Sequence, residues 1–159
     1  MNGAEFIASF IATGRLHGVG VGSSLAEVDR AFKVDYIDDF DEEPNLSLRR
    51  DYGLVEVYFN DGPEWVVVGA SVEIHRLSVV DGLAKRWHDA QAVEFSEYLT
   101  WDEVAELIPA SVGLTVKSDQ SDYLEYRAEV TKVAALVVDN QEERDDWPGQ
   151  GDVFSVSLG

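Results

Sequence analysis

The sequence contains no cysteine, which excludes disulfide cross-links, thiolate metal sites and a cysteine nucleophile. It also lacks any apolar run that approaches the roughly 20 residues needed to span a bilayer. Residues 1–5 do not have the basic start of a secretory signal. These absences together predict a cytoplasmic protein without a membrane anchor.

Basic residues are scarce. Twelve lysines and arginines stand against 31 aspartates and glutamates, for a net charge of −19. Such a charge repels nucleic acid and anionic membrane surfaces, because both are bound through cations. It favours rapid capture of a basic protein partner by electrostatic steering. The alternative is an acidic proteome, in which the charge has no specific role.

Residues suited to metals and cofactors are also few. The three histidines, His17, His75 and His88, show no metal-ligand spacing. The glycine-rich segment 18–22 follows an expected helix rather than a strand and has no lysine after it, unlike a phosphate-binding loop. The acidic tract 35–43 lacks the central glycine and register of a calcium loop. We therefore expect no cofactor and no metal.

What the chain does contain is a helix start that occurs twice. Ser24 and Glu27 have the spacing of a capping box, and Thr100 and Glu103 repeat it 76 residues later. Apolar residues follow at helical spacing: Leu25, Val28, Ala31 and Phe32 in the first copy, and Trp101, Val104, Leu107 and Ile108 in the second. A repeat of half the chain length predicts two similar units.

The periodicity elsewhere predicts an α+β fold. The expected helices are at 5–13, 24–32, 81–90 and from 100 to about 108. The expected strands are at 34–40, 46–60 (one long or broken strand), 65–77, 113–117, 123–130, 131–138 and 153–158. We expect two tandem units, 1–77 and 78–159, in one compact body. Each has a helix-loop-helix and an antiparallel sheet, and together they form a curved sheet with helices on one face.

This order and length resemble the architecture of the β-lactamase inhibitor protein family. Residues 22–28 (Gly-Ser-Ser-Leu-Ala-Glu-Val) approximate the Gly-x-Ser/Thr-x-x-Glu-Val helix start of that fold's single-unit relatives, and residues 100–104 echo it. The resemblance implies that the concave sheet face and the equivalent turns at 42–46 and 118–122 grip a target enzyme. The family's disulfides are absent here. Residues 51–56 and 73–77 also resemble stretches of small actinobacterial immunity-type proteins.

Two acidic tracts interleaved with aromatic residues are the candidate partner-binding segments. Buried aromatic anchors surrounded by charge concentrate binding energy at protein interfaces. The candidate residues are Tyr36, Asp38, Asp39, Phe40, Asp41, Glu42 and Glu43 in the first tract, and Glu142, Glu143, Asp145, Asp146 and Trp147 in the loop 139–151. The alternative is that these charges only solvate the surface or protect an edge strand from unwanted pairing.

These observations favour a non-enzymatic binding protein with no catalytic residues. The most direct hypothesis is an immunity protein or inhibitor that occludes a basic bacterial enzyme or toxin. The alternative is an enzyme or small-ligand-binding protein that uses a cleft between the two units. On an extended strand 65–77, Glu73 and His75 would share a face, with Trp65 and Trp87 as candidate neighbours.

Overall fold

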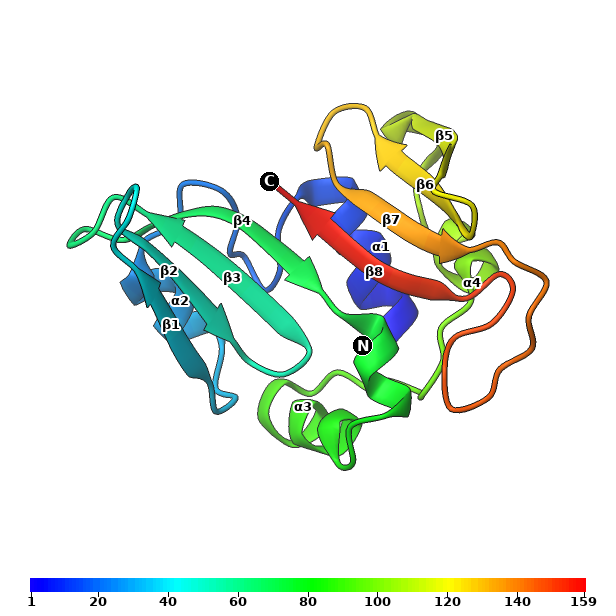
Figure 1. The fold of residues 1–159 in the computed structure, drawn as a ribbon, viewed down its shortest axis with the longest axis horizontal. Coiled ribbons are helices and arrows are strands. Elements are labelled where there is room, and N and C mark those ends of the chain that lie inside the picture. Colours follow the sequence, from blue (N-terminus) through cyan, green and yellow to red (C-terminus); the bar gives the residue numbers. More distant parts are fainter.

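One antiparallel sheet of eight strands runs the length of the molecule (Figure 1). The computed structural model describes residues 1–159. In chain order the strands are β1 (Ile37–Asp41), β2 (Ser47–Asp51), β3 (Val55–Asn60), β4 (Val66–Val72), β5 (Leu114–Asp119), β6 (Tyr123–Ala128), β7 (Ala134–Val138) and β8 (Val153–Leu158). Their spatial order is β1-β2-β3-β4-β8-β7-β6-β5, so two four-stranded meanders meet where β4 pairs with β8.

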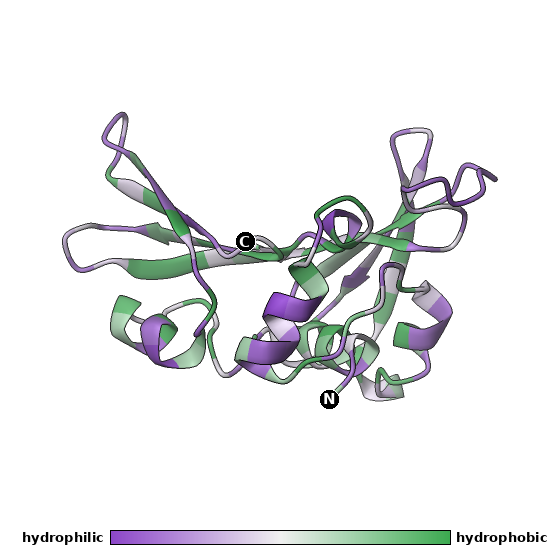
Figure 2. Ribbon diagram, turned by 90° about the horizontal axis from the view of Figure 1, so that it is seen from below, coloured by the Kyte–Doolittle hydropathy of each residue, from purple (hydrophilic) through white to green (hydrophobic).

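The four α-helices lie on one side of this sheet, and both ends of the sheet curve away from them (Figure 2). The helices are α1 (Gly3–Thr13), α2 (Leu25–Ala31), α3 (Leu83–Gln91) and α4 (Trp101–Ala105), with short 3-10 helices η1 (Ile74–Ser78) and η2 (Ala110–Val112). The predicted α+β class, with a curved sheet and a one-sided helix layer, is confirmed. Each helix is too short or too polar to traverse a lipid bilayer.

The repeated helix starts occupy equivalent places in the two halves. Ser24 caps α2 and pairs with Val66 just at the start of β4, and Thr100 caps α4 and pairs with Asp152 just before β8. In the second copy the capping box is complete, because Glu103 also accepts the Thr100 N–H at 3.1 Å. In the first copy only the Ser24 side-chain bond forms, so the prediction of two full boxes was wrong for Glu27.

The first helix of each half packs on the other half. The helix α1 packs on α4, and Thr131 at the β6–β7 turn donates to the Ile11 carbonyl at 2.7 Å. The helix α3 instead lies against the first half, where the Trp87 indole donates to the Tyr52 carbonyl at 3.2 Å. Because the helices are exchanged in this way, the two halves share one hydrophobic core.

Alternation along the strands separates the core face from the open face. In β3, Val55, Val57 and Phe59 are completely buried under the helices, while Glu56 and Tyr58 point to the opposite face.

The expected strand at 65–77 was wrong in two respects. A bulge between Tyr58 and Phe59 shifts the register, so that Val67 is buried and Val68 is 39% exposed. The strand also ends at Val72, and the chain then turns into η1, which carries His75.

Candidate functional site

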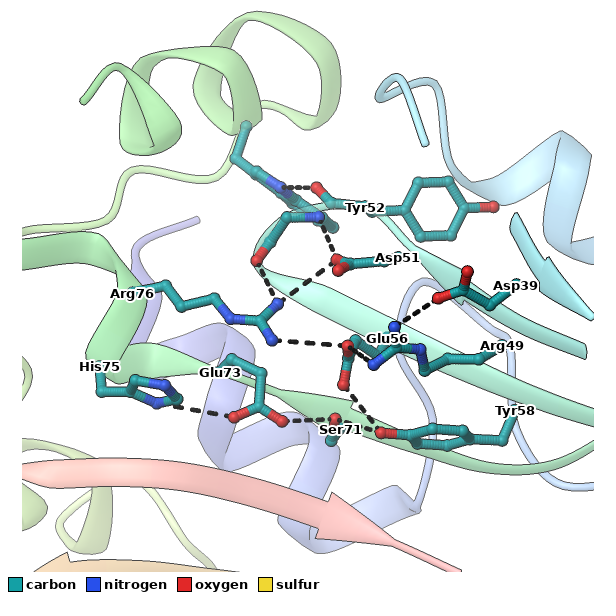
Figure 3. A network of polar contacts seen from close by, with 12 residues as sticks. Asp39, Arg49, Asp51, Tyr52, Glu56, Tyr58, Ser71, Glu73, His75 and Arg76 are labelled. Carbon is teal, nitrogen blue, oxygen red and sulfur yellow. Dashed lines mark hydrogen bonds and ion pairs between the residues drawn. The ribbon is translucent and has the colours of Figure 1, made fainter. Parts of the chain in front are cut away.

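The face of the sheet that no helix covers carries a continuous polar network (Figure 3). Its centre is Glu56, whose side chain is only 5% exposed. Arg49 on the neighbouring strand donates to Glu56 Oε1 at 3.1 Å, Arg76 from η1 approaches the same oxygen at 3.4 Å, and the Tyr58 hydroxyl donates to Oε2 at 2.8 Å. Three donors from three elements therefore converge on one buried carboxylate.

The network continues across β4 toward the second half. The Ser71 hydroxyl lies 3.4 Å from that of Tyr58 and donates to Glu73 Oε1 at 2.8 Å. The other Glu73 oxygen lies 3.6 Å from His75 Nδ1. Burial raises the pKa of Tyr58 and lowers the pKa of His75, in the latter case against the attraction of Glu73. Both groups are consequently neutral at pH 7.

An aromatic cluster lies next to His75, at the end of the network that is nearest to the second half. His75 stacks on Phe154 with the ring planes 4° apart and the centroids at 4.2 Å. Trp147 packs against both rings at 5.4 and 5.5 Å, and Tyr123 meets Phe154 edge-on. These residues come from η1, β8, the β7–β8 loop and β6, so the cluster joins the two halves of the molecule.

The network has more acids than bases. It contains four carboxylates and two guanidinium groups: Asp39, Asp51, Glu56 and Glu73 against Arg49 and Arg76. On the other half of the open face, Glu125 is matched by Lys117 and by Arg127, whose hydrogen bond lowers the pKa of that carboxyl. The excess negative charge is therefore concentrated between β1 and η1.

The first predicted acidic tract forms the edge strand β1 and the turn after it, and its members separate. Asp38 and Tyr36 face the helix layer, where Asp38 binds Arg50 in a bidentate pair at 2.8 and 3.0 Å and Tyr36 lies under the same guanidinium. Asp39 pairs with Arg49 on the open face, whereas Phe40 lies on the helix side, opposite the buried Leu48, and packs on Trp65. The remaining acids, Asp41, Glu42 and Glu43, are exposed.

The second tract lies in the ordered β7–β8 loop. Arg144 forms a bidentate pair with the buried Asp152 at 2.7 Å to each oxygen, and Gly149 approaches the backbone of residues 142–144 so closely that a Cβ would clash. Four carboxylates, Glu142, Glu143, Asp145 and Asp146, point to solvent, while Trp147 folds onto the aromatic cluster and stays 44% exposed.

The two tracts do not form one patch. Figure 1 places β1 and the β7–β8 loop at opposite ends of the sheet. The turns 42–46 and 120–122 do occupy equivalent places, since each joins the first two strands of its half.

The alternative site, expected in a cleft between the two halves, does not contain all the residues that the sequence predicted for it. Glu73 and His75 are neighbours, but the expected tryptophans are elsewhere, because Trp87 is completely buried in the core and Trp65 lies beside Phe40. The hollow beside β1, whose lining includes Tyr36, has a volume of about 260 Å³, and four others have about 330 to 450 Å³, at the lower end of the usual size of a small-molecule site. None of these five hollows is lined by Glu73 or His75.

Several residues of the network escaped prediction from sequence. Glu56 and Tyr58 alternate with buried valines in β3, and that alternation was the available signal for a polar open face. Nothing local in the sequence indicates that Arg49 and Arg76 meet at Glu56 or that Phe154 stacks on His75. No group of three or more histidine, aspartate or glutamate side chains is arranged to hold a metal ion. Comparison with models of protein families, with curated proteins and with solved structures found no match to this chain.

Proposed function

We propose that this chain is a non-enzymatic binding protein that occludes a basic partner with the open face of its sheet. The observation that carries the proposal is a whole face of an eight-stranded sheet without helix cover, curved at both ends and acidic on one half. Antiparallel sheets commonly have one solvated face, so the open face supports recognition through its excess of carboxylates beside the exposed aromatic residue Trp147.

The partner we propose is a basic bacterial enzyme or toxin, with the chain as its immunity protein or inhibitor in the cytoplasm. A net charge of −19 would speed the encounter with such a partner and repel nucleic acid and anionic membranes. The resemblance to the β-lactamase inhibitor family supports the same mode, because that family grips its target with the concave face of a two-unit sheet.

The exposed acids of the turn 42–46 and of the β7–β8 loop would act at the two rims of this face. They would steer the partner, while the partly exposed Trp147 would supply apolar contact. Phe40 lies on the helix side of β1, so it would contribute only at the edge of the sheet. Asp38 and Tyr36 would have a structural role instead, since Arg50 holds both.

The alternative of an enzyme or small-ligand carrier rests on the Glu73–His75 pair. A carboxylate beside an imidazole is a common acid–base arrangement. The pair lies outside the pronounced hollows of the surface, however, and a large open face fits a macromolecule better than a small substrate.

The test is co-expression with the basic enzymes encoded next to this gene. We expect a stable complex with one of them, loss of that enzyme's activity on binding, and an association rate that falls steeply with salt. The matched variants are Tyr58→Glu on the open face and Ala26→Glu on the exposed face of α2. If only Y58E inhibited the enzyme less than the native protein, the open face would be supported as the binding surface. If both variants inhibited the enzyme equally, that assignment would be overturned.

A further inference from the structure

The Glu73 carboxylate has no cation of its own. It accepts the Ser71 hydroxyl at 2.8 Å, and no lysine or arginine of the chain lies within 4 Å of it. Its nearest basic group is His75, which burial keeps neutral at pH 7. The neighbouring Glu56, by contrast, holds two arginines. An ionised carboxylate in so sheltered a position gains free energy from any cation that reaches it.

Trp147 and the Glu73 carboxylate lie on either side of the His75 ring, which is close to both. The His75 ring lies 3.6 Å from a Glu73 oxygen and 5.4 Å, between centroids, from the Trp147 ring. Trp147 is 44% exposed, so part of its π surface is open to a partner. Indole is the side chain that attracts cations most strongly through its ring face.

The chain itself holds arginine twice with this combination of groups. Arg50 lies 3.9 Å above the Tyr36 ring and forms a bidentate pair with Asp38. Arg144 lies 4.6 Å above the Tyr98 ring and does the same with Asp152. Near Glu73 a carboxylate and an aromatic ring are both present, with His75 between them, and no arginine of the chain pairs with this carboxylate.

We propose that Glu73 and Trp147 form a recognition site for an arginine side chain of the basic partner. This inference rests on the proposed function and names the group that the open face would receive. Guanidinium is favoured over ammonium because it is planar, stacks on aromatic rings and is less strongly hydrated than the lysine head group.

A single arginine that enters beside Glu73 would reduce the excess of carboxylates in the network from two to one and would cover part of the exposed surface of Trp147. Because the site lies where η1 meets β8, an arginine there would contact both halves of the protein at once.

The experiment uses three capped pentapeptides, Gly-Gly-X-Gly-Gly, with arginine, lysine or citrulline at the central position. The full-length protein is labelled with ¹⁵N, and the indole N–H signal of Trp147 is assigned by its loss in Trp147→Phe. We expect the arginine peptide to shift this signal in a saturable manner, and the uncharged citrulline peptide, of the same shape, to have little effect.

The variants separate this site from general attraction to an acidic protein. Glu73→Gln removes the charge and keeps the shape, and Glu27→Gln removes an exposed charge on α2, in the helix layer. We expect at least a tenfold loss of affinity in E73Q and less than a twofold loss in E27Q. Unchanged backbone spectra of both variants would show that the fold is intact.

Three results would overturn the inference: equal effects of E73Q and E27Q, equal binding of the citrulline peptide, or equal binding of the lysine peptide. If the arginine peptide shifted signals of β1 and left that of Trp147 unchanged, the arginine site would be wrong while cation binding by the open face remained. The peptide titration therefore tests the arginine site alone, and co-expression with the cognate enzyme tests the proposed function separately.

Discussion

His75 and Phe154 stack almost parallel across the junction between the two halves, with their ring centroids 4.2 Å apart. His75 belongs to η1, after the last strand of the first half, and Phe154 to the last strand of the second. The same imidazole contacts the Phe154 carbonyl at 3.3 Å and lies beside Glu73. The stack thus links the polar network of the open face to the pairing of β4 with β8.

The burial of His75 predicts that the protein becomes less stable as the pH falls below about 6.5, the pKa of histidine in an unfolded chain. Burial lowers the pKa of His75 in the folded state, so below pH 6.5 the unfolded chain binds more protons and gains stability relative to the fold. Above pH 6.5 both states are neutral at this position and the effect disappears. Denaturant unfolding between pH 7.5 and 5.5 measures the slope.

His75→Gln should reduce that slope, and His88→Gln, on the exposed surface of α3, is the matched control. Part of the slope should remain in H75Q, because the pKa of His17 is also lowered by burial. An identical slope in the native protein and in H75Q would contradict the prediction.

Loss of the Glu56 carboxylate should destabilise the fold strongly. Glu56→Ala removes the common acceptor of Arg49, Arg76 and Tyr58, and the freed donors stay in a partly buried setting. We expect a loss of about 2–4 kcal/mol in the free energy of unfolding. The control is Asp39→Ala, which removes an exposed partner of the same Arg49 and should cost less than about 1 kcal/mol. Similar losses in both variants would show that Glu56 is not the centre of the network.

The two helix caps should respond differently to removal of their glutamates. Ser24→Ala and Thr100→Ala each remove a side-chain acceptor and should cost about 1 kcal/mol. Glu103→Ala should add a measurable loss because its carboxylate accepts the Thr100 N–H, whereas Glu27→Ala should have almost none. Thermal unfolding of the four variants gives the comparison, and equal effects of the two glutamate variants would contradict it.

Neither half should fold by itself. The core of residues 1–80 needs α3, which carries Trp87, and that of residues 81–159 needs α1. We expect each fragment to show the narrow amide dispersion of an unfolded chain, and an equimolar mixture to regain the spectrum of the intact protein. A well-dispersed spectrum from either fragment alone would show that the exchanged helices are dispensable.

Local patterns were sufficient for much of the fold. The capping spacing at Ser24 and Thr100 predicts the starts of α2 and α4, because a cap is a matter of four consecutive residues. Alternation and turn residues likewise predict most strands and the equivalent turns, expected at 42–46 and 118–122, although residues 118 and 119 belong to β5. The burial of Phe6, Ile7, Phe10 and Ile11 on one face of α1 also follows the predicted pattern.

The candidate site depended on contacts between residues far apart in the chain. Pairing of Arg49 with Tyr58 and of Glu56 with Ser71 sets which side chains meet on the open face. The bulge opposite Tyr58 and Phe59 changes that register, so that Val67 is buried in place of Val68, while Ala70 and Val72 are buried as predicted. The prediction for residues 65–77 failed for this reason and because the strand ends at Val72.

By itself, the sequence determined the net charge, the absence of cysteine, the doubled helix start and the α+β class, since each depends on composition or on neighbours within a few residues. Only the tertiary structure decided which acids are neutralised by the chain's own arginines and which stay free. Asp38 and Asp152 each bind an arginine that lies over an aromatic ring, and Glu73 binds no arginine. That difference arises because strand register and helix exchange, rather than local sequence, determine which residues can reach each carboxylate.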